Sequence, residues 1–444
     1  MKLSTINSRL ITAATAVFAA FVAFAADVSD VIVRQQWPWS TDIKVEFKLT
    51  NVTTPVTVNV EASDGDTPLD TTNLKNAITG DLWGISQSGV YTFKIDPKIA
   101  FGEERNAVGD FKVRLSLTDA PANSGEILYK IVDLTKNNTW TDVRRRDFYN
   151  GKYGKFVTKF SDIDSTFSTS LDDVLIWLDV TNEVYKTDKM VFRRIPAAGK
   201  SFNMQNNADK VVTFTKDFYI GVFEVTQTQW YKFGTRTCWE TNKLYNATRP
   251  ATDLFMMSDS TRILRGRWME TLANHNWNGG YLGAMANATG LLVDLPTEAQ
   301  WEFACRAGTT AALYSGKDYS YGEAAKLARM YHGTGDRNCD LSQRTSAVGS
   351  YKPNAWGLYD MIGNAWELCL DMWSDTSSLP AGTDPLVANS ANNYYHVKRG
   401  ASITCADNWN IVTTRKSVYY GSSDDNDIGF RVCIFLDKND DGTK

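Results

Sequence analysis

The stretch Leu358-Tyr-Asp-Met-Ile-Gly-Asn-Ala-Trp-Glu367 is the first of three ordered blocks near the end of this 444-residue chain. It is followed by Lys398-Arg-Gly-Ala-Ser402 and then by Asp427-Ile-Gly-Phe-Arg431. Two further blocks lie upstream, Phe218-Tyr-Ile-Gly-Val-Phe-Glu-Val-Thr-Gln227 and Leu295-Pro-Thr-Glu-Ala-Gln-Trp-Glu-Phe-Ala-Cys305. Five landmarks in a fixed order are far less expected by chance than one short motif, so they indicate a single folded domain.

These five blocks resemble the formylglycine-generating enzyme family, also called the sulfatase-modifying factors. The resemblance covers about residues 190–435, and Met190-Val-Phe-Arg-Arg-Ile-Pro-Ala-Ala198 matches the family's first strand. It implies an α+β fold of the C-type-lectin-like kind. In active members of the family, two cysteines spaced i, i+5 hold Cu(I), and the enzyme oxidises a sulfatase cysteine to formylglycine.

The resemblance places Cys405 at the first of these two cysteine positions, just after Arg399-Gly-Ala-Ser402, and five residues later the chain has Asn410. Thiolates suit Cu(I) because they are soft ligands, whereas an amide oxygen is hard and weak. The copper pair is therefore broken, and enzymatic activity stays uncertain. Cys405 is interpreted as a disulfide partner or a buried free thiol, with a reactive cysteine or a copper ligand completed by another thiol as the alternative.

The resemblance also supplies a candidate ligand groove. Ser402 and Trp366 match residues that line the family's substrate groove, and Ser402 would join Cys405 in catalysis if activity survives. The segment from Cys405 to Asp427 is rich in Asn, Trp, Tyr, Ser and Asp, which make versatile contact surfaces. The candidate groove residues are Trp366, Trp409, Asn410 and Asp427.

A calcium site is implied for the first block. Asp360, Gly363, Ala365 and Glu367 match a structural calcium site of the family, with carboxylates at both ends and two backbone carbonyls between them. Hard cations bind several oxygens, which a turn-rich segment can direct inward. The alternative is a capped turn with two solvated acids.

All six cysteines lie in the second half of the chain, at positions 238, 305, 339, 369, 405 and 433. An even number suggests disulfides in an oxidising compartment, but six cysteines allow about 15 pairings. Relatives imply a bridge near Cys305 and Cys433. Cys433 stands one residue later than expected, which in a strand turns the side chain to the opposite face.

The region 27–119 has a different pattern, because apolar residues recur at every second position in four runs. Such alternation is typical of strands with one buried face, and the polar connections favour an all-β immunoglobulin-like sandwich. The runs are Asp42–Leu49, Val56–Glu61, Val90–Ile95 and Phe111–Leu117. Residues 120–189 are interpreted as a bridging extension that contains strands at Ile127–Val132 and Val174–Val180.

The two ends of the chain carry their own signals. Residues 1–26 have a basic start, an apolar run and small residues at a cleavage site, which predicts a signal peptide and a secreted, periplasmic or cell-surface protein. No later run is long enough to span a membrane. The net charge of −4 argues against a nucleic-acid partner. Residues 436–444 are predicted to be an acidic tail.

Three functions follow from these observations. The first is an exported, non-catalytic protein that binds a peptide, protein or glycan through the lectin-like domain, with calcium as its cofactor. The second is a formylglycine-generating oxidase that uses Cu(I) with an unorthodox thiol set. The third is a lectin-fold receptor diversified by a retroelement, whose ligand contacts would lie between Cys405 and Asp427.

Overall fold

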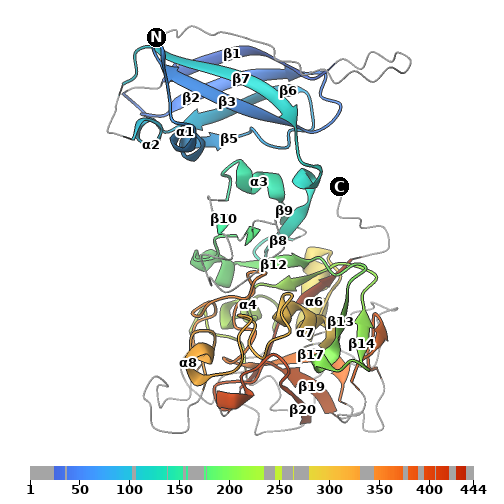
Figure 1. The fold of residues 1–444 in the computed structure, drawn as a ribbon. Helices are drawn as coiled ribbons and strands as arrows, with labels where there is room; N and C mark the ends of the chain where they lie inside the picture. Colours follow the sequence, from blue (N-terminus) through green and yellow to red (C-terminus); the bar gives the residue numbers. More distant parts are fainter. Residues whose placement is uncertain are drawn as a thin grey trace, which may run out of the picture. The chain divides into compact units, whose positions relative to one another are not determined.

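The structure is a computed structural model, and it describes part of the chain. The described residues are 25–436 except 36–37, 103–106, 138, 154–156, 159–174, 177, 235–245, 253–263, 265–279, 331–344, 374–378, 389–394, 406 and 420–426. They form a mixed α/β, sheet-rich protein of two compact units (Figure 1). The first unit runs to Glu126 and includes Arg144–Phe156, and the second comprises Ile127–Val143 and the chain from Val157 onward.

The first unit contains two sheets. The four-stranded sheet has the order β1-β2-β6-β5 and the three-stranded sheet the order β4-β3-β7. The bounds are β1 Asp27–Gln35, β2 Ile43–Thr50, β3 Val56–Asp64, β4 Thr67–Pro68, α1 Thr71–Ala77, β5 Ile78–Gly80, β6 Gly89–Ile95, α2 Pro97–Phe101, β7 Phe111–Asp119, η1 Ala122–Gly125 and α3 Arg145–Tyr149, where η marks a 3-10 helix. Strands β2, β3, β6 and β7 lie where the sequence alternates. The immunoglobulin-like topology stays a prediction.

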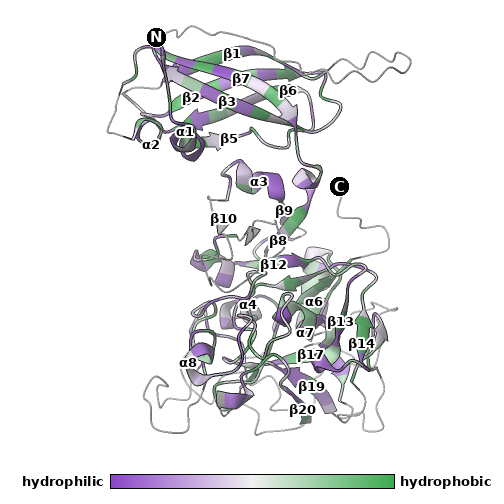
Figure 2. Ribbon diagram, viewed as in Figure 1, coloured by the Kyte–Doolittle hydropathy of each residue, from purple (hydrophilic) through white to green (hydrophobic). Residues whose placement is uncertain are grey.

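Alternation explains how this unit is stabilised. In β2, Ile43, Val45, Phe47 and Leu49 are buried, while the residues between them face outward, so apolar and polar residues alternate along the strands (Figure 2). The buried residues of both sheets belong to one apolar core. Each buried large side chain contributes about 1.5–3 kcal/mol relative to an exposed one, so this unit can be stable without a cysteine.

The second unit is organised around a six-stranded sheet of order β16-β22-β15-β12-β8-β9. Strand β8 pairs with β12 from Lys189↔Asp133 to Arg193↔Tyr129. Residues 127–144 of the predicted bridging extension thus contribute two strands to the sheet. The strands of this sheet are β8 Ile127–Asp133, β9 Trp140–Arg144, β12 Lys189–Ile195, β15 Phe218–Gly221, β16 Val293–Asp294 and β22 Cys433–Phe435.

The remaining elements of the second unit surround this sheet. A four-stranded sheet has the order β20-β19-β17-β21, and a small one joins β13, β14 and β18. The bounds are β10 Val157–Thr158, β11 Leu175–Ile176, η3 Glu183–Lys186, β13 Ser201–Asn203, η4 Met204–Asn206, β14 Val211–Thr213, α4 Gln227–Phe233, α6 Gly280–Thr289, α7 Glu298–Arg306, α8 Tyr321–Ala324, β17 Trp366–Met372, β18 Gly382–Thr383, β19 Tyr395–Arg399, η6 Asp407–Trp409, β20 Arg415–Tyr419 and β21 Ile428–Phe430.

Several predicted features lie outside the described residues. They include residues 1–24 of the signal peptide, Cys238, Cys339 and the tail from 437 to 444. Of the helices in the described part of the chain, none combines the length and apolar character that a membrane crossing requires.

Candidate functional site

Helix α7 contains most of the Leu295–Cys305 block and packs against β17 and β19 of the four-stranded sheet. Thr297 is its N-cap: its side chain accepts from Gln300 N at 3.1 Å, and Gln300 Oε1 accepts from Thr297 N at 3.0 Å. This capping box fixes the first turn of the helix. Glu298 and Glu302, which lie one turn apart on α7, are both fully buried.

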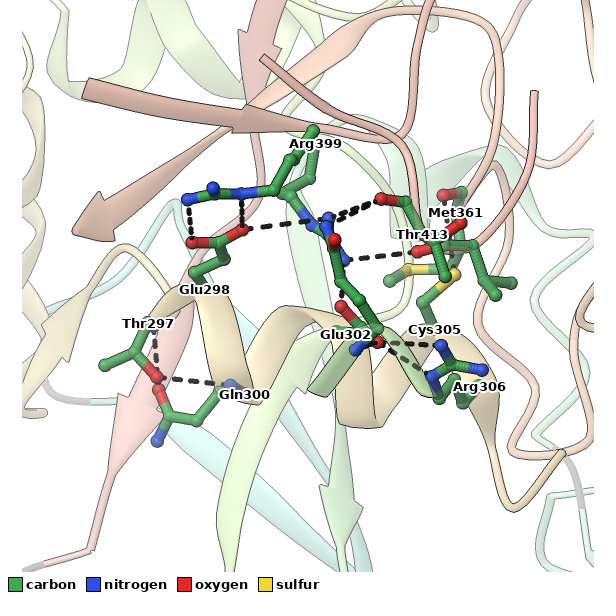
Figure 3. A network of polar contacts seen from close by, with 12 residues as sticks. Thr297, Glu298, Gln300, Glu302, Cys305, Arg306, Met361, Arg399 and Thr413 are labelled. Atoms are coloured by element: carbon green, nitrogen blue, oxygen red, sulfur yellow. Dashed lines mark hydrogen bonds and ion pairs between the residues drawn. The ribbon is translucent and has the colours of Figure 1, made fainter. Parts of the chain in front are cut away.

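These two glutamates are the centre of a buried ion network (Figure 3). Glu302 accepts from Arg306 at 2.8 Å and from the guanidinium of Arg399, and Glu298 accepts two hydrogen bonds from Arg415 at 2.7 and 2.9 Å. Arg399 also lies 3.7 Å from Glu298. Charged groups are almost never fully buried unless they are paired, so each member depends on the others.

Arg399 belongs to the Lys398–Ser402 block, and its guanidinium also binds the backbone just after the candidate groove residues. It donates to Thr413 O at 3.1 Å and to Val412 O at 3.2 Å. The buried network therefore holds the chain that follows Trp409 and Asn410. The sequence analysis did not identify these long-range partners of Glu298 and Glu302.

Asp371 is a second buried carboxylate beside this network. It accepts from Glu298 N at 2.6 Å and from Val387 N at 3.0 Å, so it connects the start of α7 with the segment after β18. Burial, followed by the negative charge of Glu298, raises the pKa of Asp371 to about 7, although the two backbone hydrogen bonds and Arg415 act in the opposite direction.

This raised pKa predicts a pH dependence of stability. Between the ordinary pKa of Asp371 and about 7, the folded protein holds a proton that the unfolded chain has lost, so this group makes stability fall as pH rises. An Asp371→Asn variant removes that titration. The difference in unfolding free energy, variant minus wild type, should rise by about 1 kcal/mol per pH unit between about pH 5 and 7. Urea melts at four pH values measure it, and a constant difference would contradict the assignment.

The predicted catalytic residues lie together in a small polar cluster. The Ser402 hydroxyl, which is fully buried, donates to Asp427 Oδ2 and lies 3.5 Å from Cys405 Sγ. Thr404 Oγ1 also donates to Asp427 Oδ2. One oxygen of the Asp427 carboxylate thus accepts from two hydroxyls, an arrangement that fixes the carboxylate next to the half-buried Cys405.

The other predicted groove residues differ in exposure. Trp366 is 3% exposed and belongs to the apolar core, with Lys398 Nζ 5.1 Å from its ring centroid. Asn410 is fully buried, whereas Trp409 is 38% exposed and has Lys416 Nζ 4.5 Å from its ring. Trp409 and the half-buried Asp427 therefore reach the surface, and Trp366 and Asn410 lie beneath it.

The predicted calcium residues lie in a buried group that contains an arginine. Glu367 accepts two hydrogen bonds from Arg431, at 2.7 and 3.0 Å, and one from Trp301 Nε1 at 2.7 Å. Asp360 accepts from Gly349 N, and its Oδ1 is buried with no hydrogen-bond partner among the described residues. Burial raises the pKa of Asp360 to about 6.

The sequence analysis missed a third carboxyl in this group, that of Glu224 in the Phe218–Gln227 block. It accepts from Asn364 Nδ2 at 2.6 Å and from Ala365 N at 3.0 Å, and is fully buried. Burial, with the charges of Asp360 and Glu367, raises the pKa of Glu224 well above its usual range. An acidic residue inside the otherwise apolar run of residues 218–225 was the signal that could have identified it.

The predicted calcium ligands fit the ion only in part. Asp360 Oδ1 is a free oxygen, but both oxygens of Glu367 already bind Arg431, and a cation there would lie beside a guanidinium. Within the described residues, no three His, Cys, Asp or Glu side chains gather so as to hold a metal ion. Of the two predicted carboxylates, only Asp360 has an oxygen without a partner among the described residues, and calcium binding stays a prediction from the resemblance.

A copper pair does not fit the described thiols either. Cys305, Cys369 and Cys433 are free and fully buried, and burial raises the pKa of each thiol. Soft coordination of Cu(I) needs a second thiolate beside Cys405, and the residue five positions on is the amide Asn410.

Cys305 and Cys433 are both free thiols in this structure, and the bridge between them stays a prediction from the resemblance. Cys305 lies near the end of α7, and its Sγ is 3.7 Å from Met361 O. Cys433 lies in β22, where it pairs with Ile220 and Asp294. Cys433 stands one residue later than the resemblance requires, and in a strand such a shift turns the side chain to the other face.

Comparison with known proteins identifies the family. The family described as "Sulfatase-modifying factor enzyme 1-like domain" matches residues 181–435, which is more than half of the chain. The chain therefore belongs to this family, as the five sequence blocks predict.

Relatives in the family include proteins named as active and as inactive enzymes. Formylglycine-generating enzyme of Mus musculus is 29% identical over 149 residues, 32% of this chain and 35% of that protein. The mouse protein named inactive C-alpha-formylglycine-generating enzyme 2 is 33% identical over 138 residues, 31% of this chain and 41% of that protein. The chain thus spans well under half the length of these relatives. Among solved structures, PvdO from Pseudomonas aeruginosa is similar with a TM-score of 0.42 and 23% identity, over 55% of this chain and 94% of that chain.

Proposed function

We propose that this protein is a non-catalytic, ligand-binding member of the sulfatase-modifying factor family. The observation that carries the proposal is Asn410, a buried amide where the family resemblance requires the second thiolate. Without that thiolate, the half-buried Cys405 has no soft partner for Cu(I) among the described residues. Because one fold can host several functions, the protein can keep a binding surface without the oxidation activity.

The binding surface of this proposal is the region around Trp409 and Asp427. Trp409 offers an exposed aromatic ring, and Asp427 offers a carboxylate whose position is fixed by Ser402 and Thr404. Aromatic rings next to fixed polar groups suit a peptide, protein or glycan ligand. A relative in the family is named as inactive, which supports the idea that the fold persists without the oxidation.

The proposed setting is outside the cytoplasm. The basic and apolar pattern of residues 1–26 supports export to the periplasm, the cell surface or the medium. The immunoglobulin-like arrangement proposed for the first unit is common in exported binding proteins, and would give the protein a second module in addition to the binding domain.

An oxidation assay tests the loss of catalysis. The purified protein, loaded with Cu(I) and supplied with oxygen and a Cys-x-Pro-x-Arg peptide, should leave the peptide mass unchanged. Conversion of the peptide cysteine to an aldehyde would contradict the proposal and favour the oxidase alternative. Asn410→Cys is the informative variant, and Asn410→Cys with Cys405→Ser is its control, because only the first restores two thiols.

A binding screen tests the other half of the proposal. Arrays of glycans and of peptides should contain a ligand whose affinity falls at least tenfold in Trp409→Ala and in Asp427→Asn. Lys326→Ala, which removes an exposed pair with Glu323, serves as a surface control. A ligand bound equally well by all variants would place the binding surface elsewhere.

A further inference from the structure

The connection between β13 and β14 holds a backbone conformation that needs an explanation. Gln205 and Asn206 have φ angles of 52° and 59°, in the left-handed region, although neither is glycine. Such residues persist only where their surroundings fix them, and they often occur at functional sites. The contacts of both side chains show what this conformation achieves.

Gln205 makes two contacts with parts of the chain that are distant in sequence. Its backbone N donates to Glu302 Oε1 at 2.7 Å, and its side-chain Nε2 donates to Thr413 O at 2.9 Å. The left-handed conformation thus directs one residue both to the buried ion network and to the chain after Trp409. Asn206 makes a third contact, from Nδ2 to Thr310 O at 3.0 Å.

The segment from Asp407 to Thr414, called here the Trp409 segment, is held mainly by such contacts. Thr413 O accepts from both Gln205 and Arg399, and Val412 N donates to Ala312 O at 2.9 Å. Inside the segment, Trp409 O accepts from Ile411 N at 2.9 Å and from Thr414 Oγ1. The carbonyl that Gln205 reaches is therefore four residues from the exposed ring.

The two donors to Thr413 O, Arg399 and Gln205, differ in charge and burial. Arg399 is fully buried and belongs to the ion network, so its loss would disturb α7 as well as the segment. Gln205 is half-buried and neutral, and its amide forms only a hydrogen bond to the segment. Its side chain can be shortened without removing a buried charge.

We propose that Gln205 is a positioning residue that fixes the Trp409 segment, and with it the exposed Trp409 ring, through the carbonyl of Thr413. The consequence for ligand binding rests on the proposed function, but the positioning itself does not. The β13–β14 hairpin thereby determines how the ring is presented, although it lies about 200 positions earlier in the sequence.

Gln205→Asn is the test variant. Asparagine tolerates the left-handed conformation and keeps the backbone bond to Glu302, but it is one methylene too short to reach Thr413 O. The matched control is Asn206→Gly, which removes the contact with Thr310 from the same connection and suits a positive φ.

Two measurements on the full chain decide the proposal. Hydrogen exchange at the amides of Ile411, Val412 and Thr414 should become about fivefold faster in Gln205→Asn, the effect of losing one neutral hydrogen bond. The amides of α7 should exchange as in the wild type. The Asn206→Gly control should leave the Trp409 segment unchanged.

The second measurement reports on the ring itself. Subtracting the emission of Trp409→Phe from that of the wild type isolates the fluorescence of Trp409, and the same subtraction in the Gln205→Asn background gives the comparison. The isolated emission should shift to the red and be quenched more strongly by acrylamide. An unchanged Trp409 signal, or equally faster exchange in α7, would overturn the proposal. A failed ligand screen would contradict the proposed function alone.

Discussion

Replacing Glu367 by alanine should lower the free energy of unfolding by about 3–5 kcal/mol, the cost of leaving a buried charge without its partner. Arg431 is fully buried, and Glu367 of β17 accepts two of its hydrogen bonds, at 2.7 and 3.0 Å. The substitution also removes the acceptor of Trp301 Nε1. In a domain of this size each kcal/mol shifts the Tm by about 2–4 °C, so the Tm should fall by at least about 6 °C.

Glu183→Ala is the matched control, because it removes a glutamate whose side chain is 68% exposed and pairs with Lys186 at 3.5 Å. Its Tm should stay near that of the wild type. Both variants should be melted with and without a chelator, which also tests calcium. A loss in Glu367→Ala that is the same in chelator identifies Arg431 as the relevant partner. A loss that disappears in chelator would show that Glu367 acts through a bound cation.

Local patterns of the sequence predicted much of the first unit. Strand β2 spans Ile43–Thr50 where alternation predicts Asp42–Leu49, and β7 spans Phe111–Asp119 where it predicts Phe111–Leu117. Alternation predicts these strands because each strand buries one face against a single core. Apolar residues therefore recur at every second position along the strand. The start of α7 was likewise predictable, since its capping signals lie within four positions of Thr297.

The candidate site was predictable as a set of positions, but not as a set of contacts. In the structure Ser402, Cys405 and Asp427 lie in one region, where Ser402 hydrogen-bonds to Asp427 and lies 3.5 Å from Cys405 Sγ. The sequence blocks did not indicate that Glu302 would meet Arg399, 97 positions away, or that Glu367 would meet Arg431. Ion pairs of this kind depend on the tertiary packing of distant segments, so no periodic pattern in the sequence predicts them.

Strand β8 is a further case in which the sequence predicts an element but not its partner. Its apolar residues predicted a strand, but the partner of a strand is set by tertiary packing, and Ile127–Val132 was interpreted as part of a bridging extension. In the structure β8 lies between β12 and β9 in the six-stranded sheet of the second unit. Its side chains Ile127, Leu128, Tyr129, Ile131 and Val132 are each at most 6% exposed.

A fragment that begins at Met190 should therefore fail to fold, whereas one that begins at Ala120 and runs to the same C-terminus should fold cooperatively. Without β8, strand β12 loses the pairing from Lys189 to Arg193. Losing the burial of five large side chains, at about 1.5–3 kcal/mol each, removes about 7–15 kcal/mol, which matches the whole stability of a typical domain. Circular dichroism melts of the two fragments measure this difference. A synthetic peptide of residues 120–144 should restore a melting transition to the shorter fragment, and a control peptide with Ile131 and Tyr129 replaced by Asp should not. A cooperative, monomeric melt of the Met190 fragment alone would show that β8 is an accessory strand, because the remaining strands would then suffice for the core.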